Sequence, residues 1–99
     1  MSNQGSDPIV SRLRQEISDV DRAILAVVNE RLELVARLKH HKDSLGLPFL
    51  DPDRERELLD DLEHKNDGPL SPDGLRELYA CLLDLTKREV TRDGKVPKL

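Results

Sequence analysis

The stretch that decides the fold runs from residue 7 to residue 48 and reads DPIVSRLRQEISDVDRAILAVVNERLELVARLKHHKDSLGLP. It opens on Asp7-Pro8, a helix cap followed by proline at the first helical position, and neither proline nor glycine recurs before Gly46. Apolar residues return at helical spacing: Ile9, Leu13, Ile17, Val20, Ile24, Val27, Val28, Leu34 and Leu38. The pattern predicts one helix over residues 8–44, roughly 54 Å long at ~1.5 Å per residue. A helix of this length favours a coiled-coil-like partner.

The rest of the chain contains two further pairs of a capping residue followed by proline. Gly46 can provide a left-handed helix stop, and Asp51-Pro52 opens a second helix, predicted over residues 52–65. Ser71-Pro72 opens a third helix, predicted to run to about residue 91. No strand pattern stands out, so the predicted fold class is all-α, with one long and two shorter helices. We expect a disordered N-terminus over residues 1–7, a helical domain over 8–91 and a flexible tail over 92–99.

Composition excludes several classes of function. The 99 residues suffice for one domain, and their net charge of -4, with both signs interspersed, argues against a nucleic-acid partner. Cys81 is the single cysteine, which excludes an intrachain disulfide and a thiolate metal cage. The polar start and the lack of a membrane-length apolar run make the cytoplasm the expected location. No metal site, glycine-rich phosphate loop or dinucleotide fingerprint is found, so no cofactor is expected.

Three cations in the long helix are candidates for holding a small anion. Arg31 and Lys42 are eleven residues apart, which places both on one helix face, although two solvated surface cations would have the same spacing. Arg14 lies roughly 42 Å from Lys42 along a straight helix and cannot reach the same small ligand from its own chain. It can do so from a second, antiparallel copy, with the two-fold axis near Ile24 or Leu25.

The second and third helices add further polar candidates. Asp51 and Glu55 are four residues apart and project from one side, with Arg54 between them. Asp51 is also the residue type that a helix N-cap prefers, and the charges that follow it are typical of a solvated face. Thr86 can donate a hydroxyl hydrogen bond, whereas Val90, four residues later, can only pack.

Together these residues resemble a known family. The stretch Leu13-Arg14-Gln15-Glu16-Ile17, then Asp21, Asn29-Glu30-Arg31, Lys42 and Asp51-Pro52-Asp53-Arg54-Glu55-Arg56 is similar to the all-helical chorismate mutases. The resemblance covers about residues 9–90. It implies an isomerase of the shikimate pathway and aromatic amino acid biosynthesis that converts chorismate to prephenate without a cofactor. It also implies an intertwined homodimer with two shared sites.

The resemblance assigns roles residue by residue. Arg14 resembles the arginine donated across the dimer to one substrate carboxylate, and Arg31 the arginine that holds the other. Lys42 resembles the lysine at the ether oxygen. Three more positions complete the expected substrate site: Asp51 and Glu55 near the substrate hydroxyl with Arg54 beside them, and Thr86 as a small hydroxyl residue.

Val90 departs from the family pattern, in which Gln or Glu binds the ether oxygen at this position. We expect Val90 to face the site, because moving Glu89 there would disturb the apolar stripe. Val90 therefore predicts a slow mutase or a relative with another substrate. Three alternatives stay open: a mutase of 4-amino-4-deoxychorismate, an isochorismate pyruvate lyase, and a non-catalytic helical dimer that binds an effector. An activating partner enzyme is also possible, with the short tail as its contact.

Overall fold

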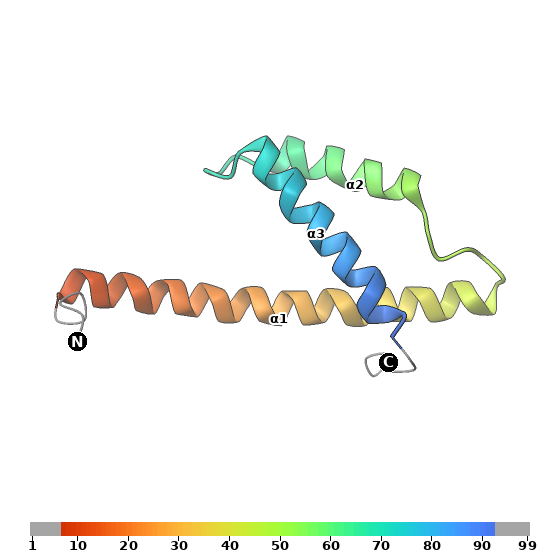
Figure 1. Ribbon diagram of the computed structural model, residues 1–99, viewed down its shortest axis with the longest axis horizontal. Coiled ribbons are helices and arrows are strands. Elements are labelled where there is room, and N and C mark those ends of the chain that lie inside the picture. The colour runs from red at the N-terminus through yellow and green to blue at the C-terminus, as the bar shows by residue number, and fades with distance from the viewer. Residues whose placement is uncertain (1–6, 93–99) are drawn as a thin grey trace. The chain divides into compact units, whose positions relative to one another are not determined.

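The computed structural model describes residues 7–92, and these form three α-helices (Figure 1). Helix α1 spans Pro8–Ser44, α2 spans Pro52–Lys65 and α3 spans Pro72–Val90. No strand occurs among residues 7–92, so the predicted all-α class, with one long and two shorter helices, is confirmed. The predicted disordered N-terminus and flexible tail lie outside the described residues, apart from Asp7 and Arg92.

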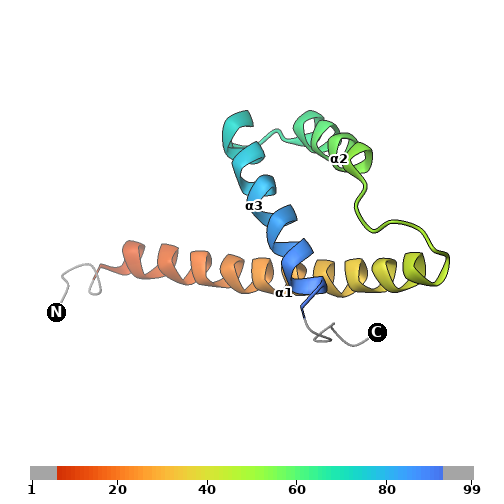
Figure 2. The ribbon, with the colours of Figure 1, turned by 45° about the vertical axis from the view of Figure 1, so that its right-hand side comes forward.

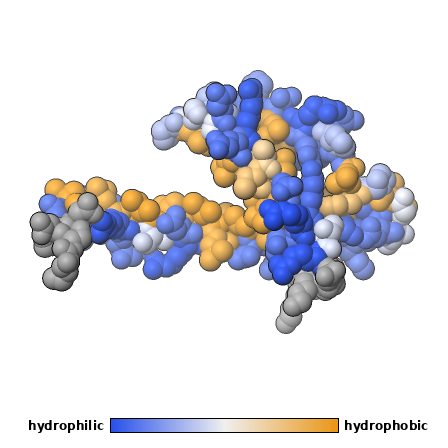
Figure 3. Space-filling model, viewed as in Figure 1, coloured by the Kyte–Doolittle hydropathy of each residue, from blue (hydrophilic) through white to orange (hydrophobic). Residues whose placement is uncertain are grey.

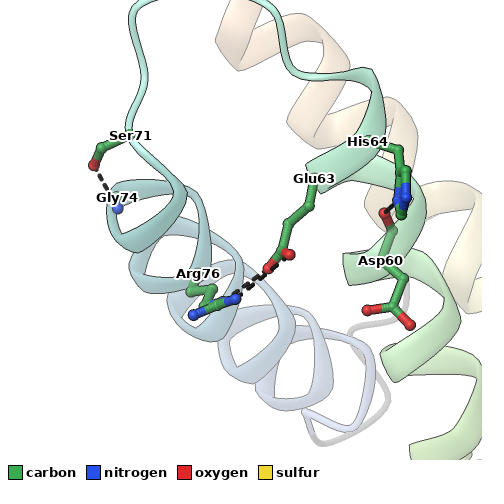
Figure 4. Close-up of polar contacts among 6 residues, drawn as sticks. All are labelled: Asp60, Glu63, His64, Ser71, Gly74 and Arg76. Atoms are coloured by element: carbon green, nitrogen blue, oxygen red, sulfur yellow. Dashed lines mark hydrogen bonds and ion pairs between the residues drawn. The ribbon is translucent and has the colours of Figure 1, made fainter.

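The helices begin where the cap-plus-proline signals predict. Asp7 Oδ1 accepts a hydrogen bond from the amide of Ile9 at 2.8 Å, and Ser71 Oγ accepts one from the amide of Gly74 at 3.0 Å (Figure 4). Each bond satisfies an amide of the first turn that has no partner within its own helix. A Cβ at Gly74 would lie only 2.9 Å from Leu70 Cδ1, so the glycine lets the Leu70 side chain fold back over the start of α3.

The chain divides into two compact units, residues 1–31 and residues 32–99. In the first, the N-terminal part of α1 carries an apolar stripe that remains open to solvent, as the row of orange atoms along this helix shows in Figure 3. The large apolar side chains of this stripe are 48–63% exposed: Ile9, Leu13, Ile17, Val20, Ile24, Leu25 and Val27. A contiguous apolar surface of this kind is typical of a protein-protein interface.

The second unit contains the end of α1 together with α2 and α3, and it holds the buried residues of the described chain. Ala36, Leu75, Thr86 and Val90 are each at most 5% exposed. Helices α2 and α3 contact each other and are joined by the short connection visible in Figure 2. None of the helices described over residues 7–92 is both long and apolar enough to cross a membrane.

Candidate functional site

A hollow of about 350 Å³ lies where α1 ends and α2 begins. Its wall combines apolar side chains with a cation and a carboxylate: Lys42, Leu47, Pro48, Leu50, Asp51 and Pro52. The volume lies at the lower end of the range for small-molecule sites, about 300–1,000 Å³. A small ligand that carries both charged and apolar parts suits such a wall.

Lys42 is held at this hollow by the way α1 ends. Gly46 has a φ of 70°, which confirms the predicted left-handed stop. The amide of Leu47 donates to the carbonyl of Lys42 at 2.9 Å, and the amide of Gly46 donates to that of Asp43 at 3.2 Å. This pair of bonds is the Schellman motif, which turns the chain sharply back over the last helical turn. The Lys42 ammonium also lies 3.5 Å from the carbonyl oxygen of Phe49, so the loop and the side chain meet.

Asp51 has two roles, because it caps α2 and lines the hollow. Its Oδ1 accepts a hydrogen bond from the amide of Arg54 at 3.1 Å. The other carboxylate oxygen is not needed for this cap. The Arg54 guanidinium lies 3.6 Å from the Glu57 carboxylate, and both side chains are about two-thirds exposed. The structure therefore brings Lys42 and Asp51 to one wall, and it directs the Arg54 side chain along the surface of α2.

Glu55 pairs with a residue that the sequence analysis missed. The ammonium of Lys87, on α3, lies 2.9 Å from Glu55 Oε2 and 3.3 Å from Glu55 Oε1. Both side chains are partly buried, with 39% of Lys87 and 31% of Glu55 exposed. The two residues are 32 positions apart, so no local spacing rule could have paired them. Their contact connects α2 to α3.

Thr86 and Val90 lie one turn apart on α3 and are both buried, at 4% and 1% exposure. The Thr86 hydroxyl donates to the carbonyl of Leu82 at 2.7 Å, a bond within its own helix. To donate a hydrogen bond to a ligand, the Thr86 hydroxyl would have to rotate away from Leu82. Glu89, the alternative to Val90 in the sequence analysis, forms an ion pair with Arg92 instead. Arg92 Nη1 lies 3.2 Å from Glu89 Oε1.

Arg14 and Arg31 belong to the first unit, whereas the other residues of the predicted site, Arg54 included, belong to the second. Arg14 is exposed and Arg31 is partly buried. Both lie on α1, the continuous helix over Pro8–Ser44. Within residues 7–92, no group of three His, Cys, Asp or Glu side chains gathers in a way that could hold a metal ion.

Comparison with known sequences decides the family. The sequence model described as chorismate mutase type II matches residues 13–90, which include every predicted site residue from Arg14 to Val90. This chain belongs to the chorismate mutase type II family. The solved structure of chorismate mutase (form II) from Thermus thermophilus is similar to it, with a TM-score of 0.80 and 33% sequence identity. That likeness covers 85% of this chain and 96% of the other.

Of three curated relatives of this chorismate mutase family member, two are several times longer than this chain and one is of about the same length. A bifunctional chorismate mutase/prephenate dehydratase from Aquifex aeolicus is 32% identical over 80% of this chain and 24% of its own length. The T-protein of Enterobacter agglomerans is 42% identical over 50% of this chain and 13% of its own length. A chorismate mutase from Methanocaldococcus jannaschii is 33% identical over 52% of each. The chain thus spans between about an eighth and a half of these relatives.

Proposed function

We propose that this chain is an isomerase that converts chorismate to prephenate. The observation that carries the proposal is the placement of the Lys42 ammonium and the Asp51 carboxylate on one small hollow, within a chain of the chorismate mutase type II family. The substrate is a compact dicarboxylate with an apolar ring and a hydroxyl group. Its chemistry matches a wall that combines charged and apolar residues.

The reaction suits this set of residues because it needs neither a nucleophile nor a cofactor. Chorismate rearranges within one molecule: the ether C–O bond breaks as a C–C bond forms, and no proton is transferred. The site must hold a compact conformer and stabilise the negative charge that grows on the ether oxygen. Cations on the two carboxylates would supply the first need, and Lys42 at the ether oxygen would supply the second.

The proposal includes a homodimer whose two sites each draw on both chains. Arg31 and Lys42 of one chain would bind a carboxylate and the ether oxygen, and Arg14 of the second chain would bind the other carboxylate. The open apolar stripe over residues 9–27 supports this arrangement, because an antiparallel copy of the same stripe would cover it. A shared site also explains why Arg14 lies so many helical turns before Lys42.

The remaining residues would position the substrate ring. Asp51 and Glu55 would face its hydroxyl group with Arg54 nearby, and Val90 would pack against the ring. The Thr86 hydroxyl would rotate away from the Leu82 carbonyl to donate a hydrogen bond to a carboxylate oxygen. The absence of a second donor at residue 90 predicts a slow enzyme. This suits activation by a partner enzyme, which the fused bifunctional relative also supports. A cytoplasmic location belongs to the same proposal, since the single cysteine suits a reducing compartment.

The direct test is conversion of chorismate to prephenate by the purified chain, followed by absorbance. Lys42→Ala should lower turnover at least about a hundredfold, since it removes the cation at the ether oxygen. Lys65→Ala is the matched control, because Lys65 pairs with Asp61 on the exposed side of α2 and should not affect the rate. Turnover of only the 4-amino analogue, release of pyruvate from isochorismate, or binding without turnover would each replace the proposal with one of the three alternatives.

A further inference from the structure

Lys87 is a cation with no role in the proposed reaction, but it is paired with Glu55, a residue of the predicted site. Its ammonium lies between the two oxygens of the Glu55 carboxylate, at 2.9 Å and 3.3 Å. Both side chains are more than half buried, so water screens this pair less than it screens the exposed pairs of α2. The Glu55 carboxylate is therefore already neutralised by a residue of its own chain.

This pairing changes what Glu55 can recognise. A carboxylate has about four lone-pair positions, so one that binds an ammonium group can still accept a hydrogen bond from a neutral hydroxyl. Its attraction for a second cation, however, is largely offset by repulsion between that cation and Lys87. Without Lys87, the Glu55 carboxylate should bind an ammonium group more tightly than a hydroxyl group, and Lys87 should remove that preference.

We propose that Lys87 is a specificity-determining residue, which by pairing with Glu55 makes the site select a ring hydroxyl over a ring ammonium group. The inference rests on the proposed function, in which Glu55 faces the substrate hydroxyl, and it names the substrate class more closely. Chorismate carries the hydroxyl, and its 4-amino analogue carries an amine that is protonated at neutral pH. Lys87 acts through Glu55 and is a positioning residue.

The chain provides a matched control for a merely structural role of Lys87. Arg76 on α3 pairs with Glu63 on α2 at 2.7 Å, so it ties the same two helices together through the same kind of bond (Figure 4). Neither Arg76 nor Glu63 belongs to the predicted site, whereas Glu55, the partner of Lys87, does. Loss of Arg76 should weaken the α2–α3 contact without changing the charge at Glu55.

The experiment measures kcat/KM and, by calorimetry, the Kd for chorismate and for the 4-amino analogue in four proteins. These are the wild type, Lys87→Met, which removes the charge, Lys87→Arg, which keeps it, and Arg76→Met. The wild type and Lys87→Arg should favour chorismate. Lys87→Met should shift the ratio towards the amino analogue by about fivefold, the size expected for one partly screened charge pair. Arg76→Met should leave the ratio unchanged.

Two results would overturn the inference alone: an active wild type with the same substrate ratio in Lys87→Met, or an equal loss on both substrates in that variant. The first would mean that the charge does not reach the ligand. The second would mean that Lys87 only supports the fold or contacts a group common to both substrates. A wild type that neither binds nor converts either compound would overturn the proposed function, and the inference would fall with it.

Discussion

Glu63 on α2 and Arg76 on α3 form a two-pronged ion pair: Arg76 Nε lies 2.7 Å from Glu63 Oε1, and Arg76 Nη2 lies 3.5 Å from Glu63 Oε2. The hydrogen bond from Arg76 holds the pKa of the Glu63 carboxyl below its usual value, and the same bond raises the pKa of Arg76. This pair joins the end of α2 to the beginning of α3, and the Glu55–Lys87 pair joins the beginning of α2 to the end of α3.

The first prediction concerns the pH dependence of this pair. A carboxyl with a lowered pKa in the folded chain stabilises the fold above its unfolded pKa, and the contribution is lost as the pH falls through the folded value. Glu63→Gln should therefore lower the Tm slightly at pH 7, and the difference from the wild type should shrink as the pH falls below the unfolded pKa of Glu63, about 4.3, and through its lower folded pKa. Thermal melts over a series of pH values from 7 downwards measure this. A difference that stays the same over the whole series would show that the charge of Glu63 is irrelevant.

The positions at which the helices begin were predictable, because each is marked by two adjacent residues, a capping residue and a proline. In Asp51-Pro52 and Ser71-Pro72, a side-chain oxygen that can cap a helix comes directly before a proline, which has no amide N–H to donate. Helices α2 and α3 begin at these two prolines. Gly46 was predictable for the same reason, since few other residues adopt its positive φ. Such signals depend on residues that are adjacent in the sequence and not on how the helices pack against one another.

The contacts between helices were not predictable in this way. Lys87 and Glu55 are in contact although they are 32 positions apart in the sequence. Lys87 is one of several charged residues near the end of α3, and nothing in the sequence around it indicates which residue it will pair with. The bond from the Thr86 hydroxyl to Leu82 also had to be seen, because a threonine can equally direct its hydroxyl to a ligand. The sequence thus identified candidate residues, and the packing of the helices decided their partners.

The second prediction concerns Gly46, whose positive φ ends α1. A Cβ at this position meets nothing within 4 Å, so the cost of a substitution comes from the backbone alone. Gly46→Ala should lower the free energy of unfolding by about 1 kcal/mol, and Gly46→Asn should lower it less. Urea denaturation checks both values. Equal stability of the alanine variant and the wild type would mean that the turn does not need a left-handed residue.

The third prediction separates the two roles of Asp51. Asparagine caps a helix as well as aspartate does, but it lacks the negative charge. Asp51→Asn should keep the wild-type stability and lower chorismate turnover, whereas Asp51→Ala should lower turnover and also cost about 1 kcal/mol of stability. Ser71→Ala, which removes the cap of α3, is the control that should lower stability alone. Full activity of Asp51→Asn would leave Asp51 with the capping role only.

The fourth prediction tests the shared site. Arg14→Ala and Lys42→Ala chains should each be inactive, because each lacks one cation of every site. In a mixture that exchanges subunits, half of the mixed dimers' sites would combine an intact Arg14 with an intact Lys42, so activity should return. Differently tagged chains show whether exchange occurs. Exchange without any recovery of activity would contradict a site that draws on both chains.

The last prediction concerns Val90, which is 1% exposed and one turn after Thr86. If its side chain faces the bound substrate, a glutamine there would provide the second donor to the ether oxygen that the family pattern contains. Val90→Gln should then raise kcat for chorismate by about tenfold or more, since one donor to a developing oxyanion contributes roughly a hundredfold or more when optimally placed. The same change should lower the free energy of unfolding by about 1–3 kcal/mol, because it buries an amide. Val90→Leu, which adds volume without a donor, is the control that should not gain rate. A folded Val90→Gln variant with unchanged kcat would place residue 90 in the packing of α3 and would leave Lys42 as the donor on which the rate depends.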